Sequence, residues 1–215
     1  MQFLKENISL HKYTTYKVGG KARYFAEPSN LDEIQEVLQW RKQQKLPLFI
    51  LGKGSNLVVS DSGFEGLVLY FGRNFKKIKI NGTQIYAEAG ALLHSLVQKS
   101  VNQGLIGMEN LGGIPGTIGG GVYINAGAFD QELNQTIVKV TSITHNGDLI
   151  IRSTSECGFA YRHSNFFQWK EIILSAEFVL SQSEKESVKK QFHHILQKRK
   201  GKQPLEYPNA GSMYK

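Results

Sequence analysis

Cysteine and long hydrophobic runs are both scarce in this chain of 215 residues. The single cysteine, Cys157, excludes an internal disulfide and a thiolate-rich metal site, and we expect it to be a small, half-buried apolar residue. No apolar stretch approaches the roughly 18 residues that span a bilayer, and Met1–Lys17 mixes charged and apolar residues, unlike a signal peptide. We therefore expect a cytoplasmic protein that does not engage a membrane.

Several common catalytic and phosphate-binding patterns are also missing. No stretch has the G-x-G-x-x-G spacing of a dinucleotide-binding loop, and the P-loop pattern is absent because Val122 rather than lysine follows Gly121. The histidines form no H-E-x-x-H pattern, so we expect no metal site. The absence of G-x-S-x-G argues against a hydrolase.

The charge balance favours anionic partners, because 26 Lys and Arg residues face 18 Asp and Glu residues, for a formal net charge of +8. One basic segment, Lys189–Lys202, contains no acidic residue, and we interpret it as the solvated face and C-terminal turn of a helix. A nucleic-acid-binding protein is the alternative, but the chain lacks a recognition motif and a surface of interleaved aromatic residues. The same charge would attract anionic small molecules.

The first half of the chain predicts a helix between two strands. Apolar residues of segment 30–47 recur on one helix face, Asn30 and Glu33 have the pattern of a capping box, and Pro47 ends the helix. Residues 47–51 (PLFIL) then predict a short buried strand. A turn, GKGSN, and a second strand, GLVLYF, follow.

The second half predicts an alternation of strands and helices. The expected elements are a strand (QIYAEAG), a helix (ALLHSLVQKSVNQGL) ending before Gly104, a hairpin turning at Asn146-Gly147, a strand (EIILSAEFVL), and a helix capped by Ser183 and Glu186. These patterns indicate an α+β or mixed α/β protein with a subdomain boundary near Gly72–Lys79.

Glycine is concentrated in two segments. Gly112–Phe129 (GGIPGTIGGGVYINAGAF) holds seven of the 22 glycines. Each glycine in a packed element costs roughly 0.5–1 kcal/mol relative to alanine, so the run needs a reason such as tight turns or a ligand against bare backbone. Leu51–Asn56 (LGKGSN) follows a predicted strand, where successive backbone N–H groups can converge on an anion. Either segment alone can be an ordinary turn, but together the two loops can hold a pyrophosphate from opposite sides.

Five motifs in a fixed order resemble one enzyme family over essentially the whole chain. They are TYKVGG at Thr15–Gly20, LGKGSNLVVSD at Leu51–Asp61, GIPGTIGGGVYINAGAF at Gly113–Phe129, YRHSNF at Tyr161–Phe166 and NAGSMYK at Asn209–Lys215. The combination is similar to the UDP-N-acetylenolpyruvoylglucosamine reductases, which are flavoenzymes of bacterial peptidoglycan synthesis.

The resemblance implies an α+β fold of the vanillyl-alcohol-oxidase (PCMH) type that binds FAD between two subdomains. We expect these subdomains at residues 1–73 and 74–202, with residues 203–215 as the start of a largely missing substrate-binding domain. The residues that the resemblance assigns to FAD binding lie in the two glycine-rich loops and in a wall beside the flavin. They are Leu51, Gly52, Gly54, Ser55, Asn56, Leu57, Gly113, Ile114, Pro115, Gly116, Gly119, Asn125, Ala126 and Gly127.

The resemblance also implies a reaction, in which NADPH reduces FAD and the enolpyruvyl ether of UDP-N-acetylglucosamine is then reduced to UDP-N-acetylmuramate. Arg162 would hold the substrate carboxylate and stabilise its enolate form, because a guanidinium is permanently charged and fork-shaped. Ser212 would donate a proton to the adjacent carbon. Tyr161 and Lys202 would contact the substrate. We expect a monomer without nucleic-acid, membrane or metal partners.

The sequence stops at Lys215, whereas members of the family continue through a domain that binds the UDP-sugar and end near a catalytic glutamate. No residue here can be assigned the role of that glutamate. We therefore expect the chain to bind FAD but to reduce its substrate poorly. The alternatives are a non-catalytic FAD-binding fragment of the enzyme and a related FAD-linked oxidase that reacts with oxygen.

Overall fold

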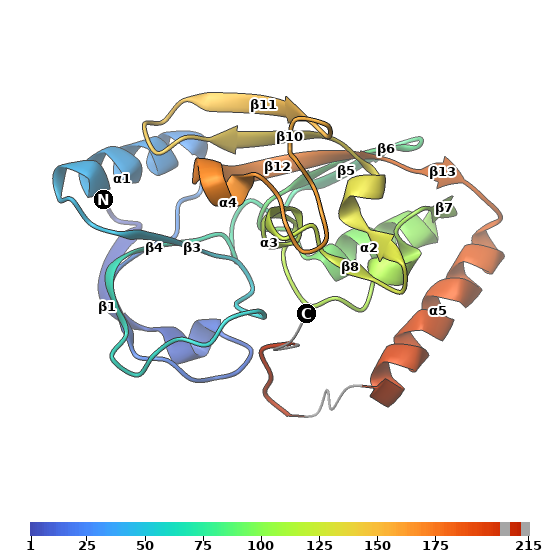
Figure 1. The fold of residues 1–215 in the computed structure, drawn as a ribbon, viewed down its shortest axis with the longest axis horizontal. Coiled ribbons are helices and arrows are strands. Elements are labelled where there is room, and N and C mark those ends of the chain that lie inside the picture. The colour runs from blue at the N-terminus through green and yellow to red at the C-terminus, as the bar shows by residue number, and fades with distance from the viewer. Residues whose placement is uncertain (203–206, 212–215) are drawn as a thin grey trace.

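A computed structural model describes residues 1–202 and 207–211, with only the backbone of Lys202, and two sheets organise these residues (Figure 1). The first sheet has four strands in the order β1 (Leu4–Ser9), β2 (Lys21–Ala26), β4 (Phe64–Tyr70) and β3 (Leu48–Leu51). Strands β1 and β2 are antiparallel, whereas β4 lies parallel to both of its neighbours. The predicted strands within PLFIL and GLVLYF are therefore confirmed.

Helix α1 (Leu31–Gln43) covers one face of this sheet, as its sequence predicts. Its buried residues Ile34, Val37 and Leu38 share a core with Leu67 and Leu69 of β4. The side chain of Asn30 accepts a hydrogen bond from the backbone of Glu33, which confirms one half of the expected capping box. The carboxylate of Glu33 accepts from Ser29 rather than from Asn30, so the other half is shifted by one residue.

The opposite face of the four-stranded sheet has a smaller core beside the 3-10 helix η1 (Leu10–Tyr13). The prediction of a buried strand at PLFIL was wrong in one respect. Strand β3 forms an edge of the sheet, and its residues Phe49 and Ile50 are each 38 % exposed. A continuous apolar run does not distinguish an edge strand from a buried one, because the same run of apolar residues can occupy either position in a sheet.

The second sheet has five antiparallel strands. Their order is β11 (Leu149–Ser153), β10 (Ile137–Ile143), β12 (Ile172–Val179), β6 (Gln84–Glu88) and β5 (Ile78–Asn81). The predicted hairpin is confirmed as β10 and β11, and Gly147 in its turn has a φ of +97°. Strand β5 was not predicted, although its sequence IKIN alternates apolar and polar residues, because it lies within a charged stretch.

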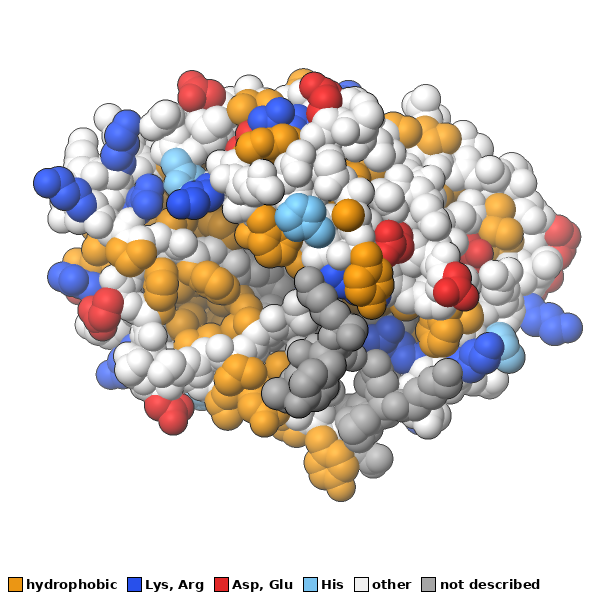
Figure 2. Space-filling model, in the orientation of Figure 1, with side chains coloured by type: hydrophobic (Ala, Val, Ile, Leu, Met, Phe, Trp, Pro, Cys, Tyr) orange, Lys and Arg blue, Asp and Glu red, His pale blue; other side chains and the backbone are white. Residues whose placement is uncertain are grey.

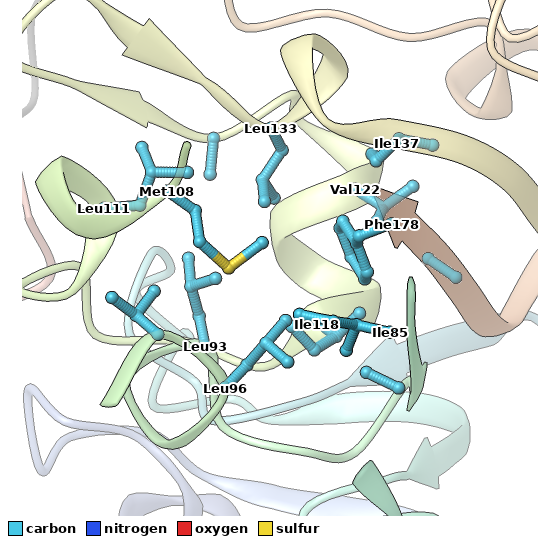
Figure 3. Close-up of a cluster of buried hydrophobic side chains, with 14 of the residues drawn as sticks. Ile85, Leu93, Leu96, Met108, Leu111, Ile118, Val122, Leu133, Ile137 and Phe178 are labelled. Carbon is cyan, nitrogen blue, oxygen red and sulfur yellow. The ribbon is translucent and has the colours of Figure 1, made fainter. Parts of the chain in front are cut away.

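Two helices, α2 (Leu93–Asn102) and α3 (Ile118–Tyr123), lie beneath the five-stranded sheet, and a third, α5 (Lys185–Lys202), packs against α2 (Figure 1). Figure 3 shows Ile118 and Val122 of α3 among the apolar side chains of the largest core. The glycine-rich run was predicted as a loop, but its residues 118–123 form a helix that packs against β12 and β6.

Short elements connect these helices and strands. They are α4 (Phe166–Trp169), the ribbons β7 (Leu105–Ile106) with β13 (Ser181–Gln182) and β8 (Gly127–Ala128) with β9 (Gln131–Glu132), and the 3-10 helices η2 (Glu109–Leu111) and η3 (Leu133–Gln135). The predicted cap of the last helix was wrong, because the carboxylate of Glu184, not Ser183, accepts from the first helical N–H groups. Cys157 is fully buried rather than half-buried.

Helix α1 joins the two sheets. Its buried residues pack in one core with Ile143, Ile172 and Leu174 of the second sheet. Every strand of the first sheet precedes residue 73, and every strand of the second follows it. The division into subdomains at 1–73 and 74–202 stays a prediction, and residues 203–206 and 212–215 of the expected third part lie outside the described residues. Within the described part, no helix is both long and apolar enough to cross a membrane.

Candidate functional site

The first glycine-rich loop leaves the end of the edge strand β3 and turns sharply against the N-terminal segment. Gly54 has a φ of +66°, and a Cβ at this position would collide with the carbonyl oxygen of Tyr13. The backbone N–H of Thr15 donates to the carbonyl of Gly54 at 3.0 Å. Only glycine meets both requirements without strain, so the loop lies close against residues 13–15.

The second loop, residues 113–117, runs from η2 to the start of α3 and touches the first loop. The hydroxyl of Ser55 donates to the carbonyl oxygen of Pro115 at 2.6 Å. A Cβ on Gly52 would collide with the side-chain oxygen of Thr117, the N-cap residue of α3. The structure therefore brings together two loops that are about sixty residues apart in the sequence, as the hypothesis of a shared site requires.

Two glycines of the second loop and helix have different surroundings. Gly116 has room for a side chain, because among the described residues beyond its chain neighbours the one atom within 4 Å of a Cβ there is the Ser55 hydroxyl oxygen, at 3.7 Å. Gly119 has no such room, since its Cβ would lie 2.9 Å from the Cβ of Ala89, and its N–H donates to the Ala89 carbonyl. Gly116 thus borders space beside the loops, whereas Gly119 packs α3 against the chain after β6.

The predicted flavin wall follows directly after α3. Asn125 and Ala126 are buried, and Asn125 has a φ of +45°. Its side-chain NH₂ donates to the carboxylate of Glu132 at 2.8 Å and to the carbonyl of Ala160 at 3.1 Å. A six-residue helix is about 9 Å long, which sets the separation between the loop at one end of α3 and the wall at the other. Both predicted parts of the site therefore depend on this short helix.

Arg162 lies against the wall. Its Nη2 donates to the carbonyl of Gly127 at 2.6 Å, and its Nη1 is 3.5 Å from a carboxylate oxygen of Glu132. The guanidinium carbon lies 4.8 Å from the ring centre of Tyr161, which is 62 % exposed. The structure thus brings three predicted site residues, Gly127, Tyr161 and Arg162, into contact.

The C-terminal segment returns to the first loop. The hydroxyl of Thr15 donates to the carbonyl of Asn209 at 2.7 Å. A Cβ on Gly211 would lie 3.5 Å from the side-chain oxygen of Asn56. The predicted proton donor Ser212 lies outside the described residues, as does the side chain of Lys202.

The remaining predicted residues have ordinary positions in or beside the loops. Leu51 and Ser55 are buried, and Leu57, Gly113 and Ile114 are partly buried. Figure 2 shows hydrophobic side chains gathered in a hollow beside β3 and β4, on the face that carries the C-terminal segment. An apolar surface next to two loops that expose backbone N–H groups suits a ligand with both a flat ring system and phosphates.

Two residues of the site were not predicted from the sequence. Glu132 pairs with Gly127 in the β8–β9 ribbon, and no periodic pattern marks such a short pairing. Arg199 lies against Gly113, its Nε is buried without a hydrogen-bond partner among the described residues, and burial lowers the pKa of its guanidinium. A signal for Arg199 exists, because it follows Phe192 by seven residues and Ile195 by four, on the buried face of α5.

The described residues contain no group of three or more His, Cys, Asp or Glu side chains that could hold a metal ion. Burial raises the pKa of the Cys157 thiol to about 11, so this cysteine is a neutral core residue.

Comparison with known proteins identifies the class. Residues 22–152 match the family model described as an FAD binding domain. The structure resembles 6-hydroxy-D-nicotine oxidase from Arthrobacter nicotinovorans with a TM-score of 0.58 at 20 % identity, over 74 % of this chain and 36 % of that one. The protein is therefore a flavoprotein with an FAD-binding fold of the vanillyl-alcohol-oxidase type, which confirms the predicted fold.

More similar relatives identify the family within that class. UDP-N-acetylenolpyruvoylglucosamine reductase from Lactobacillus acidophilus is 40 % identical over 212 residues, which cover 99 % of this chain and 71 % of the relative. The crystal structure of the enzyme from Thermus caldophilus superposes with a TM-score of 0.85 at 31 % identity, over 99 % of this chain and 75 % of that one. The chain belongs to the UDP-N-acetylenolpyruvoylglucosamine reductase family and is an FAD-dependent oxidoreductase.

Proposed function

We propose that this protein reduces the enolpyruvyl ether of UDP-N-acetylglucosamine to UDP-N-acetylmuramate, with bound FAD as cofactor and NADPH as reductant, as a step of peptidoglycan synthesis. The observation that carries the proposal is the contact between the two glycine-rich loops, with Arg162 held at the far end of α3. The names of the relatives support this substrate.

The loops suit the pyrophosphate of FAD. Gly52 and Gly54 allow the first loop to lie close against Thr117 and the N-terminal segment, and Gly116 borders open space in the second loop. Converging N–H groups stabilise an anion without a charged side chain. We assign the predicted cofactor residues of both loops to this part of the site, and residues 125–127 to the wall beside the flavin.

Arg162 suits the carboxylate of the substrate. Its Nη1 is buried and has no hydrogen-bond partner among the described residues, although Nη2 is already bound to Gly127. A guanidinium N–H in this state is available to an arriving carboxylate oxygen, and the permanent charge stabilises the negative charge that develops there. Bound FAD would supply two-electron hydride transfer between NADPH and the enolpyruvyl double bond.

The proton that completes the reduction requires a donor near the same carbon. We assign this role to Ser212, because it lies in the NAGS motif through which the chain resembles the family. Tyr161, beside Arg162, and Lys202 are assigned to substrate binding. The two FAD-binding subdomains remain proposed at residues 1–73 and 74–202.

Reduction of the flavin under anaerobic conditions tests the proposal. The chain is loaded with FAD. The visible absorbance band of the bound flavin, at about 450 nm, is then followed. NADPH should bleach the band, and the enolpyruvyl sugar nucleotide should restore it. Reoxidation by oxygen without any response to either compound would instead identify an FAD-linked oxidase. Bleaching by NADPH that the sugar nucleotide never reverses would identify a flavin-binding chain without the proposed substrate reaction.

A further inference from the structure

Glu132 contacts Asn125 of the flavin wall and also Arg162, which lies against that wall. We propose that Glu132 is a positioning residue, whose carboxylate holds Arg162 and Asn125 in the orientation that receives the substrate carboxylate. The inference rests on the proposed function, because it assigns Arg162 to carboxylate binding.

The two oxygens of the Glu132 carboxylate face different partners. Oε2 accepts a hydrogen bond from the side-chain NH₂ of Asn125 at 2.8 Å, and Oε1 lies 3.5 Å from Nη1 of Arg162. The side-chain oxygen of Asn125 in turn accepts from the backbone N–H of Asn134 at 3.0 Å. One carboxylate therefore connects the flavin wall to the guanidinium.

Both partners of Glu132 have strained backbones. Arg162 has a φ of +52° and Asn125 a φ of +45°, which are left-handed conformations that side chains rarely adopt. Such conformations persist only where surrounding contacts determine them, and they cluster at functional sites. The Glu132 carboxylate is the one side-chain group in the described structure that contacts both residues.

Glu132 is itself fixed in place. It pairs with Gly127 across the β8–β9 ribbon, and it forms a reciprocal capping box with Gln135 at the start of η3. The backbone N–H of Glu132 donates to the side-chain oxygen of Gln135 at 3.3 Å. A carboxylate fixed by the β8–β9 pairing and by the backbone N–H of Gln135 can orient the Arg162 guanidinium.

The pair leaves a guanidinium N–H available. Nη1 of Arg162 lies at ion-pair distance from Glu132 but has no hydrogen-bond partner among the described residues. The 3.5 Å between Nη1 and Oε1 is longer than a hydrogen bond, so this contact itself adds little to the stability of the fold. The effect of Glu132 should therefore appear in ligand binding rather than in folding.

The test compares two ligands on the FAD-loaded chain. The variant Glu132→Gln keeps an oxygen that can accept from Asn125 but loses the charge facing Arg162. Binding of the enolpyruvyl sugar nucleotide, followed through the perturbed flavin spectrum, should weaken about tenfold, because coupling in such networks is commonly of this size. Binding of UDP-N-acetylglucosamine, which lacks the carboxylate, should not change.

A double-mutant cycle and a matched control complete the design. The loss caused by Arg162→Lys should be smaller in the Glu132→Gln background than in the wild type, because both substitutions disable the same carboxylate contact. Glu177→Gln removes the charge from an exposed ion pair with Lys139 on the five-stranded sheet, and it should change neither affinity.

Three outcomes would overturn the inference. Equal weakening of both ligands would show a general structural role for Glu132, and unchanged binding of the enolpyruvyl compound would show no role. Additive losses in the cycle would show that Glu132 does not act through Arg162. A wild-type chain that binds FAD but never responds to the enolpyruvyl compound would refute the proposed function itself, which is a separate result.

Discussion

Within the second glycine-rich loop and the helix that follows it, glycine serves two purposes at the level of single residues. At Gly119 the absent side chain permits close packing, because the carbonyl and Cβ of Ala89 occupy the space where a Cβ would lie. At Gly116 the protein leaves that space open. A substitution at Gly119 therefore tests packing, whereas a substitution at Gly116 tests the ligand.

Valine at Gly116 should abolish FAD binding while the fold is retained. The added side chain would enter the space beside the Ser55 hydroxyl that we assign to the cofactor, and its Cβ would be in ordinary contact distance there. Dialysis against FAD followed by a visible spectrum measures the bound flavin, and circular dichroism measures the fold. A Gly116→Val variant that stays yellow would show that this glycine serves the turn alone.

The matched control is Gly82→Val, in the hairpin turn between β5 and β6. Gly82 has a φ of +57° and no neighbouring atoms, so valine there should lower stability without touching the loops. This variant should keep its FAD, which separates loss of ligand from loss of stability.

Single residues also show where sequence reasoning ended. The motifs marked Ser55 and Arg162, which contact the predicted site residues Pro115 and Gly127 respectively. They did not mark Glu132, because its role depends on a two-residue ribbon that closes in space. Arg199 was assigned to a solvated helix face because its charge was considered before its position in the helical period.

At the level of elements, one buried ion pair joins three segments of the five-stranded sheet. Arg152 of β11 donates to Glu171, just before β12, through two nitrogens, and the Ser142 hydroxyl of β10 donates to the same carboxylate at 2.7 Å. The Arg152 guanidinium also lies 3.8 Å above the ring of Trp169 in α4. This network attaches the edge strand to its neighbours.

The pKa of Glu171 gives this network a pH dependence. Burial alone would raise the pKa of this carboxyl, but the hydrogen bonds from Arg152 and Ser142 outweigh burial and hold it below the ordinary value of 4.5. Because the folded-state pKa is the lower one, the contribution to stability is fully present above the unfolded-state pKa and is lost as the pH falls through the folded-state pKa.

Glu171→Gln should therefore destabilise the protein by roughly 3 kcal/mol near pH 7, because it leaves a largely buried guanidinium without its counter-ion. The difference from the wild type should shrink as the pH falls from about 4.5 through the lower folded-state pKa, below which the wild-type carboxyl is also neutral. Urea unfolding at several pH values measures both effects. A difference that is independent of pH would contradict the assigned charge.

Most of the longer elements could be predicted from sequence, and the shorter ones could not. Helix α1 has a clear apolar face and an N-cap, so the spacing of its apolar residues was sufficient to predict it. Helix α3 contains three glycines in six residues, and it forms only because Ile118 and Val122 are buried in the core. The exposure of β3 depends on its place at the sheet edge, which no local pattern encodes.

At the level of the whole molecule, the proposed cofactor site joins the two sheets. The first loop continues from β3 of the four-stranded sheet, and the second leads into α3 beneath the five-stranded sheet. The family resemblance found from the motifs was needed to name FAD, since glycine spacing alone leaves the ligand open. Helix α1 already joins the sheets through a shared core, so a bound ligand would add a second connection.

Hydrogen exchange with and without FAD tests this account most directly. If FAD lies between the loops, amides of residues 52–57 and 113–119 should exchange more slowly together when it binds, because a ligand protects the groups that it contacts. Amides of the outer strand β11 should keep their rates. FAD that binds while either loop exchanges at its original rate would contradict the shared site.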